Sequence, residues 1–169
     1  MSFQSCCSLC CPFLVALLIA ACGGSGGSGA EGPPTVVSSP VEVSGAERTI
    51  EMAFANPSGA DKILIVQMMI APDLNSQKSC WIEYAPDARS VRMMDGSGEG
   101  RAGEPGSVSN AQCTIDTAQL THLVEGNSLR VTVPVLLGSG LAGPQNIFAL
   151  ASTASQHSGW QPMGTWTRE

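Results

Sequence analysis

The sequence predicts an all-β fold, a sandwich of two antiparallel sheets, over residues 35–169. Apolar and polar side chains alternate in several segments, which is the pattern of strands with one buried face. Segments rich in Gly, Pro, Asn and Asp separate these strands at short intervals, as they do in sandwiches. The 169 residues include 19 Gly and 11 Pro but only 5% aromatic residues. This composition favours turns and short strands over a helical bundle.

Two segments show the clearest alternation of apolar and polar side chains. Ile50, Met52 and Phe54 share one phase, and four apolar residues share one phase within residues 129–135. Each pattern places one apolar face on a core and the other face outward. Pro134 lies on the outward phase of the second segment and has no N–H to donate to a neighbouring strand. We therefore predict that this strand lies at a sheet edge or carries a bulge at Pro134.

A nearly continuous apolar run covers residues 63–70. It follows a turn at 56–59, stops at Ala71-Pro72, and is β-branched at three of its first four positions. Its composition and length favour a strand, so we predict a central strand here. The remaining predicted strands cover residues 79–85, 90–94, 112–116, 145–152 and 159–167. Between them we expect a long glycine-rich loop at 95–110 and an ambiguous stretch at 117–124 that could form one helical turn.

The N-terminal segment has the character of a targeting signal. Residues 1–30 contain no Asp, Glu, Lys or Arg, and residues 13–21 are an unbroken apolar run. A membrane-spanning helix needs about 20 apolar residues, whereas the apolar region of a secretory signal needs about 7–15. The run ends in Ile19-Ala20-Ala21-Cys22-Gly23, which resembles the lipobox of bacterial lipoproteins. The resemblance implies a lipoprotein signal peptide over residues 1–21 and a mature N-terminus at Cys22 that carries acyl chains such as palmitate.

Other interpretations of this segment stay open. Residues 1–7 lack the Lys or Arg of an ordinary signal peptide, which leaves a plain signal peptide or an uncleaved anchor as alternatives. Cys7 and Cys10 also have the spacing of a metal-ligand pair, with Cys6 and Cys11 beside them. No second Cys or His pair follows at the spacing of a zinc finger, so export with lipidation is the prediction.

A tether follows the predicted signal peptide. Residues 22–34 comprise the lipidated Cys22 and a segment rich in Gly and Ser that ends in Pro33-Pro34. A flexible chain of this kind reaches roughly 20 Å, which lifts a domain clear of lipid headgroups. More than one acyl chain gives stable anchoring. The sequence therefore predicts a cell-envelope protein, either lipid-anchored to a bacterial membrane, with the outer membrane as the first choice, or secreted.

Two cysteines remain in the predicted domain, Cys80 and Cys113, and both fall on predicted strands. Disulfides form and persist outside the reducing cytosol, so the predicted export favours a disulfide between them. Two separate buried thiols are the alternative. Closing a loop of about 33 residues stabilises a fold by roughly 3–4 kcal/mol when the effect is treated as chain entropy.

Five segments of the domain, taken in order, resemble a known module. They are residues 65–70 (IVQMMI), 79–84 (SCWIEY), 108–114 (VSNAQCT), 142–148 (AGPQNIF) and 158–167 (SGWQPMGTWT). Together they resemble an Ig-like β-sandwich module that is found, often repeated, in large bacterial surface proteins. The resemblance covers nearly all of residues 36–168 and implies an Ig-like topology and the pairing of Cys80 with Cys113. It implies no activity, and this chain differs in carrying a single copy on its own predicted lipid anchor.

Composition and motifs argue against several function classes. A net charge of −6, with only 8 basic residues, provides no basic surface for nucleic acid. The G-x-S-x-G match at residues 23–27 and four G-x-G-x-x-G matches lack the strand before and the helix after that their chemistry requires. His122 and His157 stand in turn-like segments without a set of partners. We therefore predict no enzyme, no metal and no cofactor; a hydrolase assembled from distant residues is an alternative.

Three residues are candidate ligand contacts. Asp95 and Glu99 place oxygen atoms in a glycine-rich loop loosely like a calcium loop, although the later bidentate Glu is missing. Trp81 is out of phase with Cys80 and Ile82, so its indole lies on the outer face of its strand, where aromatic rings can stack on sugars. The prediction is a membrane-tethered, non-catalytic module that binds a protein or glycan partner or has a structural role at the cell surface. A carbohydrate- or calcium-binding module is the first alternative.

Overall fold

The structure is a computed structural model that describes residues 32–168, apart from residues 75, 96, 98 and 103–105. The described chain consists of strands joined by loops, with single turns of 3-10 helix at η1 (Ala60–Lys62) and η2 (Ser76–Lys78). The strands are β1 (Thr35–Val36), β2 (Val41–Ser44), β3 (Glu47–Ala55), β4 (Ile65–Ala71), β5 (Cys80–Ala85), β6 (Ser90–Met94), β7 (Gly100–Ala102), β8 (Ser107–Ser109), β9 (Cys113–Asp116), β10 (Thr121–Glu125), β11 (Ser128–Leu137), β12 (Pro144–Ser152) and β13 (Gln161–Thr167). The predicted signal peptide, Cys22 and most of the tether lie outside the described residues.

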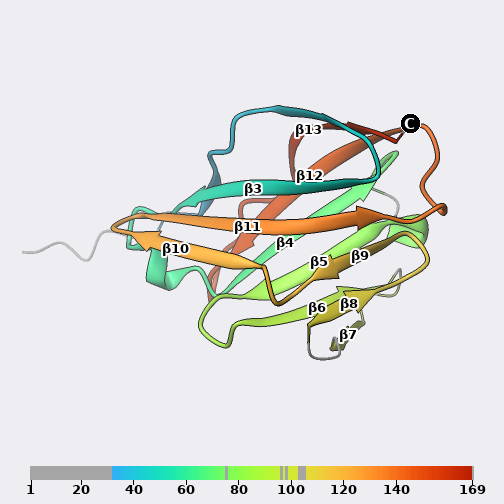
Figure 1. Ribbon diagram of the computed structural model, residues 1–169. Coiled ribbons are helices and arrows are strands. Elements are labelled where there is room, and N and C mark those ends of the chain that lie inside the picture. Colours follow the sequence, from blue (N-terminus) through green and yellow to red (C-terminus); the bar gives the residue numbers. More distant parts are fainter. Residues whose placement is uncertain (1–31, 75, 96, 98, 103–105, 169) are drawn as a thin grey trace, which may run out of the picture.

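These strands form two sheets that pack face to face (Figure 1). The first sheet has the order β1-β3-β11-β9-β8, with β10 pairing another part of β11, and the second has the order β2-β13-β12-β4-β5-β6-β7. The A-B-E-D order of an immunoglobulin sandwich corresponds to β1-β3-β11-β9, and its G-F-C-C′-C″ order corresponds to β13-β12-β4-β5-β6. The predicted all-β, Ig-like sandwich is therefore confirmed at the level of the fold.

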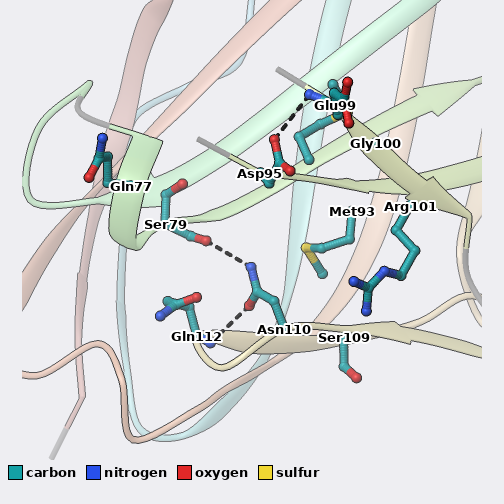
Figure 2. A pocket seen from close by; sticks show the side chains of 11 residues that line it. Gln77, Ser79, Met93, Asp95, Glu99, Gly100, Arg101, Ser109, Asn110 and Gln112 are labelled. Atoms are coloured by element: carbon teal, nitrogen blue, oxygen red, sulfur yellow. Dashed lines mark hydrogen bonds between the residues drawn. The ribbon is translucent and has the colours of Figure 1, made fainter. Parts of the chain in front are cut away.

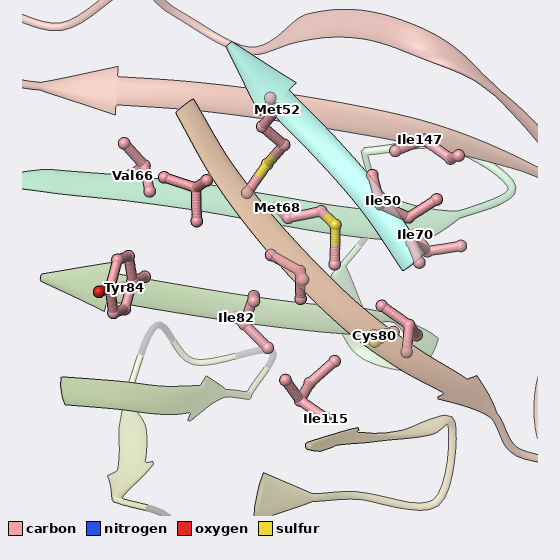
Figure 3. Close-up of a cluster of buried hydrophobic side chains, with 14 of the residues drawn as sticks. Ile50, Met52, Val66, Met68, Ile70, Cys80, Ile82, Tyr84, Ile115 and Ile147 are labelled. Atoms are coloured by element: carbon pink, nitrogen blue, oxygen red, sulfur yellow. The ribbon is translucent and has the colours of Figure 1, made fainter. Parts of the chain in front are cut away.

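The core lies between the two sheets and follows the predicted alternation (Figure 3). β3 buries Ile50, Met52 and Phe54, and β5 buries Ile82 and Tyr84, in each case at every second position. The apolar run predicted as a central strand forms β4, which pairs with β12 on one side and β5 on the other. Because each fully buried large apolar side chain contributes about 1.5–3 kcal/mol, this interface is the main source of stability.

The Cys80–Cys113 disulfide joins the two sheets. Cys80 begins β5 and Cys113 begins β9, and their Cα atoms lie 5.5 Å apart. The predicted disulfide is confirmed, and the alternative of two separate thiols is wrong. Antibody domains place their disulfide between strands B and F. Here it connects the strands at the C′ and D positions, so it fixes one side of the sandwich rather than its centre.

One strand pair departs from the predicted antiparallel arrangement. β2 runs parallel to β13, with Val41 opposite Gly164 and Val43 opposite Trp166. Trp166 is fully buried, and its indole N–H donates to the Gly45 carbonyl at 2.7 Å. This hydrogen bond fastens the turn after β2 to the core. With only two apolar residues, β2 carries too little pattern to predict a partner or a direction.

Pro134 lies neither at a sheet edge nor at a bulge, so that prediction is wrong. β11 pairs with β3 along residues 128–136 without a shift in register. Its other side is shared by β10, which pairs as far as Thr132, and β9, which pairs from Val135. The N–H of Leu137 donates toward β3. Backbone N–H groups of successive residues in a strand point to opposite sides, so the nitrogen of Pro134 points away from β3. On that side it lies between the end of β10 and the start of β9, where the missing N–H of proline costs no hydrogen bond of a strand pair.

The helical turn considered for residues 117–124 does not form, because the second half of this stretch belongs to β10. β10 makes a hairpin with β11 through Gly126 and Asn127. Gly126 has φ 58°, and glycine at the first position of a two-residue turn favours this connection. The long loop predicted at 95–110 also contains two short strands, β7 and β8. Strands of three residues show too little alternation to be predicted.

Candidate functional site

A pocket of about 500 Å³ opens on one side of the sandwich, where β6 and β7 of one sheet approach β8 and β9 of the other (Figure 2). Asp95 and Glu99, the two ligand contacts predicted in the glycine-rich loop, both line it. Met93 and Met94 of β6 supply apolar surface, and further polar groups come from Gln77, Arg101 and Gln112, among others. The volume lies in the range of small-molecule sites.

Asp95 closes the turn that leads from β6 to β7. Its Oδ1 accepts hydrogen bonds from the Ser97 hydroxyl at 2.6 Å, the Ser97 N–H at 2.9 Å and the Glu99 N–H at 3.0 Å. The Asp95 N–H donates to the Glu99 carbonyl at 2.9 Å. These bonds, first of all the one from the Ser97 hydroxyl, lower the pKa of the Asp95 carboxyl below its ordinary value. The carboxylate therefore stays ionised and holds Glu99 at the pocket.

Asn110 ties the pocket wall to the disulfide. Its Nδ2 donates to the Ser79 carbonyl at 3.0 Å. Its Oδ1 accepts from the N–H groups of Gln112 at 2.8 Å and Cys113 at 2.9 Å. Ser79 and Gln112 directly precede Cys80 and Cys113 in the chain. The side-chain amide of Asn110 and the Cys80–Cys113 disulfide therefore together fix the spacing between β5 and β9.

Several residues that complete this pocket were not predicted from the sequence, above all Ser79, Asn110 and Gln112. A signal for two of them was present. Ser79 directly precedes Cys80 and Gln112 directly precedes Cys113, so a disulfide between the two cysteines implies that Ser79 and Gln112 lie close together. Gln77 and Arg101 had no such signal, since they come from a 3-10 turn and a three-residue strand.

The pocket combines planar polar side chains with apolar surface. Carboxylates accept hydrogen bonds, guanidinium groups donate them, and amides do both. All three kinds of group line this pocket beside the side chains of Met93 and Met94. The carboxylates belong to Asp95 and Glu99, the guanidinium to Arg101 and the amide to Gln112. A ligand with many hydroxyl groups and a less polar ring face, which is the character of a saccharide, matches such a lining.

Trp81 lies elsewhere, on the outer face of the second sheet. Its half-buried ring meets Trp160 edge to face, with the ring centroids 6.0 Å apart and the planes at 72°. Its Nε1–H donates to Gln67 Oε1 at 3.3 Å. The outward phase predicted for Trp81 is therefore correct, but Trp81 is not among the residues that line the pocket of Asp95 and Glu99.

A row of polar contacts connects Trp81 to the pocket rim. Gln67 Nε2 donates to Glu83 Oε2 at 3.0 Å, and Glu83 Oε1 lies 3.6 Å from an Arg92 guanidinium nitrogen. Another guanidinium nitrogen of Arg92 donates to the carbonyl of Gly100 at 3.0 Å, and Gly100 lines the pocket. This row crosses β4, β5, β6 and β7, so the outer face of the sheet supports the position of β7.

In the part of the chain that the structure describes, no group of three or more His, Cys, Asp or Glu side chains is placed to hold a metal ion. In the loop compared with a calcium site, Asp95 Oδ1 is engaged by the turn. The calcium alternative stays a prediction. The two histidines lie outside this pocket: His122 contacts Tyr84, and His157 Nδ1 accepts from the Gly159 N–H at 3.0 Å.

Among the described residues, no helix has the length and apolar character needed to cross a membrane.

No family model matches the chain, and no curated protein matches it.

Proposed function

We propose that this chain is a non-catalytic binding module of the bacterial cell envelope that holds a saccharide in the pocket between β6–β7 and β8–β9. The observation that carries the proposal is the joint lining of that pocket by Asp95, Glu99, Arg101 and Gln112 over the side chain of Met93. Planar polar groups of this kind form paired hydrogen bonds with neighbouring hydroxyls. The resemblance to Ig-like modules of bacterial surface proteins is consistent with such a role.

The state of Asp95 argues against its use as the proton donor of a hydrolase. A glycosidase needs one carboxyl with a raised pKa to protonate the leaving group. The pKa of Asp95 is instead lowered, because its carboxylate accepts the hydrogen bonds of the turn, that of the Ser97 hydroxyl foremost. Among the described residues, neither His122 nor His157 lines this pocket. These features support a site that holds its ligand unchanged.

Removing the charged groups of the pocket should weaken saccharide binding. We expect a glycan array to identify an oligosaccharide ligand, and Glu99→Gln and Arg101→Ala each to weaken it by about tenfold or more, because a charge-assisted hydrogen bond is worth about 1.5–3 kcal/mol. Calorimetric titration of the wild type and both variants measures the effect.

Matched controls lie on the outer face of the other sheet. Glu51→Gln on β3 and Arg130→Ala on β11 remove the same charges from exposed positions outside the pocket. Both controls should bind the saccharide like the wild type. An array without a response, or equal losses in the controls and the pocket variants, contradicts the proposal. The same titrations with calcium chloride test the calcium alternative.

The proposed location depends on lipidation at Cys22, which lies outside the described residues. We expect the wild-type chain to appear in the membrane fraction as a processed, acylated form. Cys22→Ala should leave a soluble form or an unprocessed precursor, because the acylated thiol is gone. Fractionation and metabolic labelling with a fatty acid analogue measure both properties. Unchanged processing and fractionation of Cys22→Ala would rule out the anchor, whatever the pocket binds.

A further inference from the structure

A second pocket, of about 310 Å³, lies at the other end of the β5–β6 hairpin. Tyr84 of β5, Val91 of β6 and Arg89 of the turn between them form one side. Thr121 and His122 of β10 face them, together with Thr117, Ala118 and Leu120. Leu120 packs against the core, so the pocket has apolar surface next to polar groups.

The charge of this pocket is positive, although the protein as a whole has a net charge of −6. Arg89 is the charged residue in its lining, and no Asp or Glu belongs to that lining among the described residues. Arg89 takes part in neither of the salt bridges of the described chain. Asp116 lies nearby in sequence, but its Oδ1 accepts from backbone N–H groups and its Oδ2 accepts from Gln119 Nε2 at 2.6 Å. Asp87 belongs to the same turn as Arg89 and does not line the pocket.

Tyr84 and His122 form a hydrogen-bonded pair in this pocket. The Tyr84 hydroxyl and His122 Nδ1 lie 2.6 Å apart, and the Tyr84 side chain is buried. Burial raises the pKa of Tyr84, and the Arg89 guanidinium offsets this in part, so the phenol keeps its proton at neutral pH. In the imidazole tautomer whose proton lies on Nε2, the Tyr84 hydroxyl donates to His122 Nδ1. In that tautomer, the Nε2–H of His122 and the guanidinium of Arg89 are both N–H donors.

The backbone of Arg89 is strained. Arg89 has φ 48° and is the one non-glycine residue with positive φ in the described part of the chain. It ends the four-residue turn between Ala85 and Ser90, and its N–H donates to the Pro86 carbonyl at 3.2 Å. A left-handed position at such a turn is usually glycine, because a side chain there carries a backbone penalty. Strained residues of this kind cluster at ligand sites, where the side chain has a use.

We propose that this pocket binds the carboxylate of a small organic acid, with Arg89 as the charged donor and the Nε2–H of His122 as a second donor. Three observations coincide here: a cavity without lining acids, an arginine kept where glycine is favoured, and a histidine oriented by a buried phenol. The apolar surface of Val91 and Leu120 receives the body of the acid. The site is separate from the proposed saccharide pocket and does not depend on it.

Butyrate and butyramide test this assignment in the full chain, because they differ in charge and share their shape. We expect butyrate to shift the amide resonances of residues 84–91 and 117–122 in NMR spectra, with butyramide giving no saturable shift. Arg89→Gly should weaken butyrate binding by about tenfold or more, because it removes a charge-assisted hydrogen bond. Its melting temperature should equal or exceed that of the wild type, since glycine relieves the strain. Arg130→Ala is the matched control and should bind butyrate normally.

Tyr84 offers a second readout, because it is the one tyrosine of the chain. Its phenolate absorbance in the near ultraviolet reports its pKa directly. We expect butyrate to raise the pKa of Tyr84 in the wild type, since a bound anion next to Arg89 disfavours the phenolate. Arg89→Gly should raise that pKa without ligand and abolish the response to butyrate. Equal binding of butyrate and butyramide, or full butyrate binding by Arg89→Gly, would overturn the proposal.

Discussion

We expect replacement of both Cys80 and Cys113 by alanine to lower the free energy of unfolding by about 3–4 kcal/mol. The two residues are separated by 33 positions, so the disulfide closes a long loop in the unfolded chain. Losing the bond returns conformational entropy to the unfolded state. The native state also loses its covalent link between β5 and β9, and both cysteines are buried in the core.

Chemical denaturation of the double variant and of the oxidised and reduced wild type measures this effect. The reduced wild type keeps the sulfur atoms, so it separates the loss of the bond from the loss of side-chain volume. We expect the reduced protein to account for most of the destabilisation. Saccharide affinity should fall in parallel, since the hydrogen bonds of Asn110 depend on the spacing of the two strands. A reduced protein with an unchanged denaturation midpoint would show that the link is energetically neutral.

Gly164→Ala should destabilise the fold by roughly 2–4 kcal/mol, through steric overlap and backbone strain together. Gly164 has φ 147° and lies beside a bulge, where the register of β12 and β13 shifts between Ile147 and Phe148. A Cβ atom at this position would overlap the backbone carbonyl oxygen of Val41 on β2. Because backbone atoms of a paired strand cannot turn aside as a side chain can, we expect β2 to separate from β13.

Gly143→Ala is the matched control for this substitution. Gly143 also has positive φ, 74°, but a Cβ atom there would meet nothing within 4 Å. The control should therefore cost only the backbone penalty of about 1–2 kcal/mol. Thermal denaturation compares the two variants. Hydrogen exchange at the Gly45 N–H, which donates to the Thr167 carbonyl at 3.1 Å, tests the loss of β2. Equal costs for both substitutions would contradict the role assigned to the close approach of Val41.

Long alternating segments made most of the sandwich predictable. β3, β5 and β11 each bury one face, so their sequences show a period of two. β4 reads as an apolar run because both of its faces are buried over residues 68–71. The disulfide followed from the two cysteines of the domain and the predicted export. These features depend on local patterns, which a sequence displays directly.

The unpredicted parts depend on contacts between distant segments. β1, β2, β7 and β8 have two to four residues each, and they are strands because a longer neighbour supplies their hydrogen bonds. Pro134 was misjudged because its position depends on where β10 ends and β9 begins. Asp95 and Glu99 were found as polar loop residues. Arg89 was missed because no sequence pattern marks a strained arginine in a turn.

The β5–β6 hairpin contributes a wall to each of the two pockets. Met93 and Met94 stand at one of its ends, and Tyr84, Arg89 and Val91 stand at the other. Within the second sheet, this hairpin is held between β4 and β7, and its two ends are therefore joined by the ladder of β5 and β6. If a ligand in one of the two proposed pockets changes the affinity of the other pocket, thermodynamic reciprocity requires that both affinities change by the same factor.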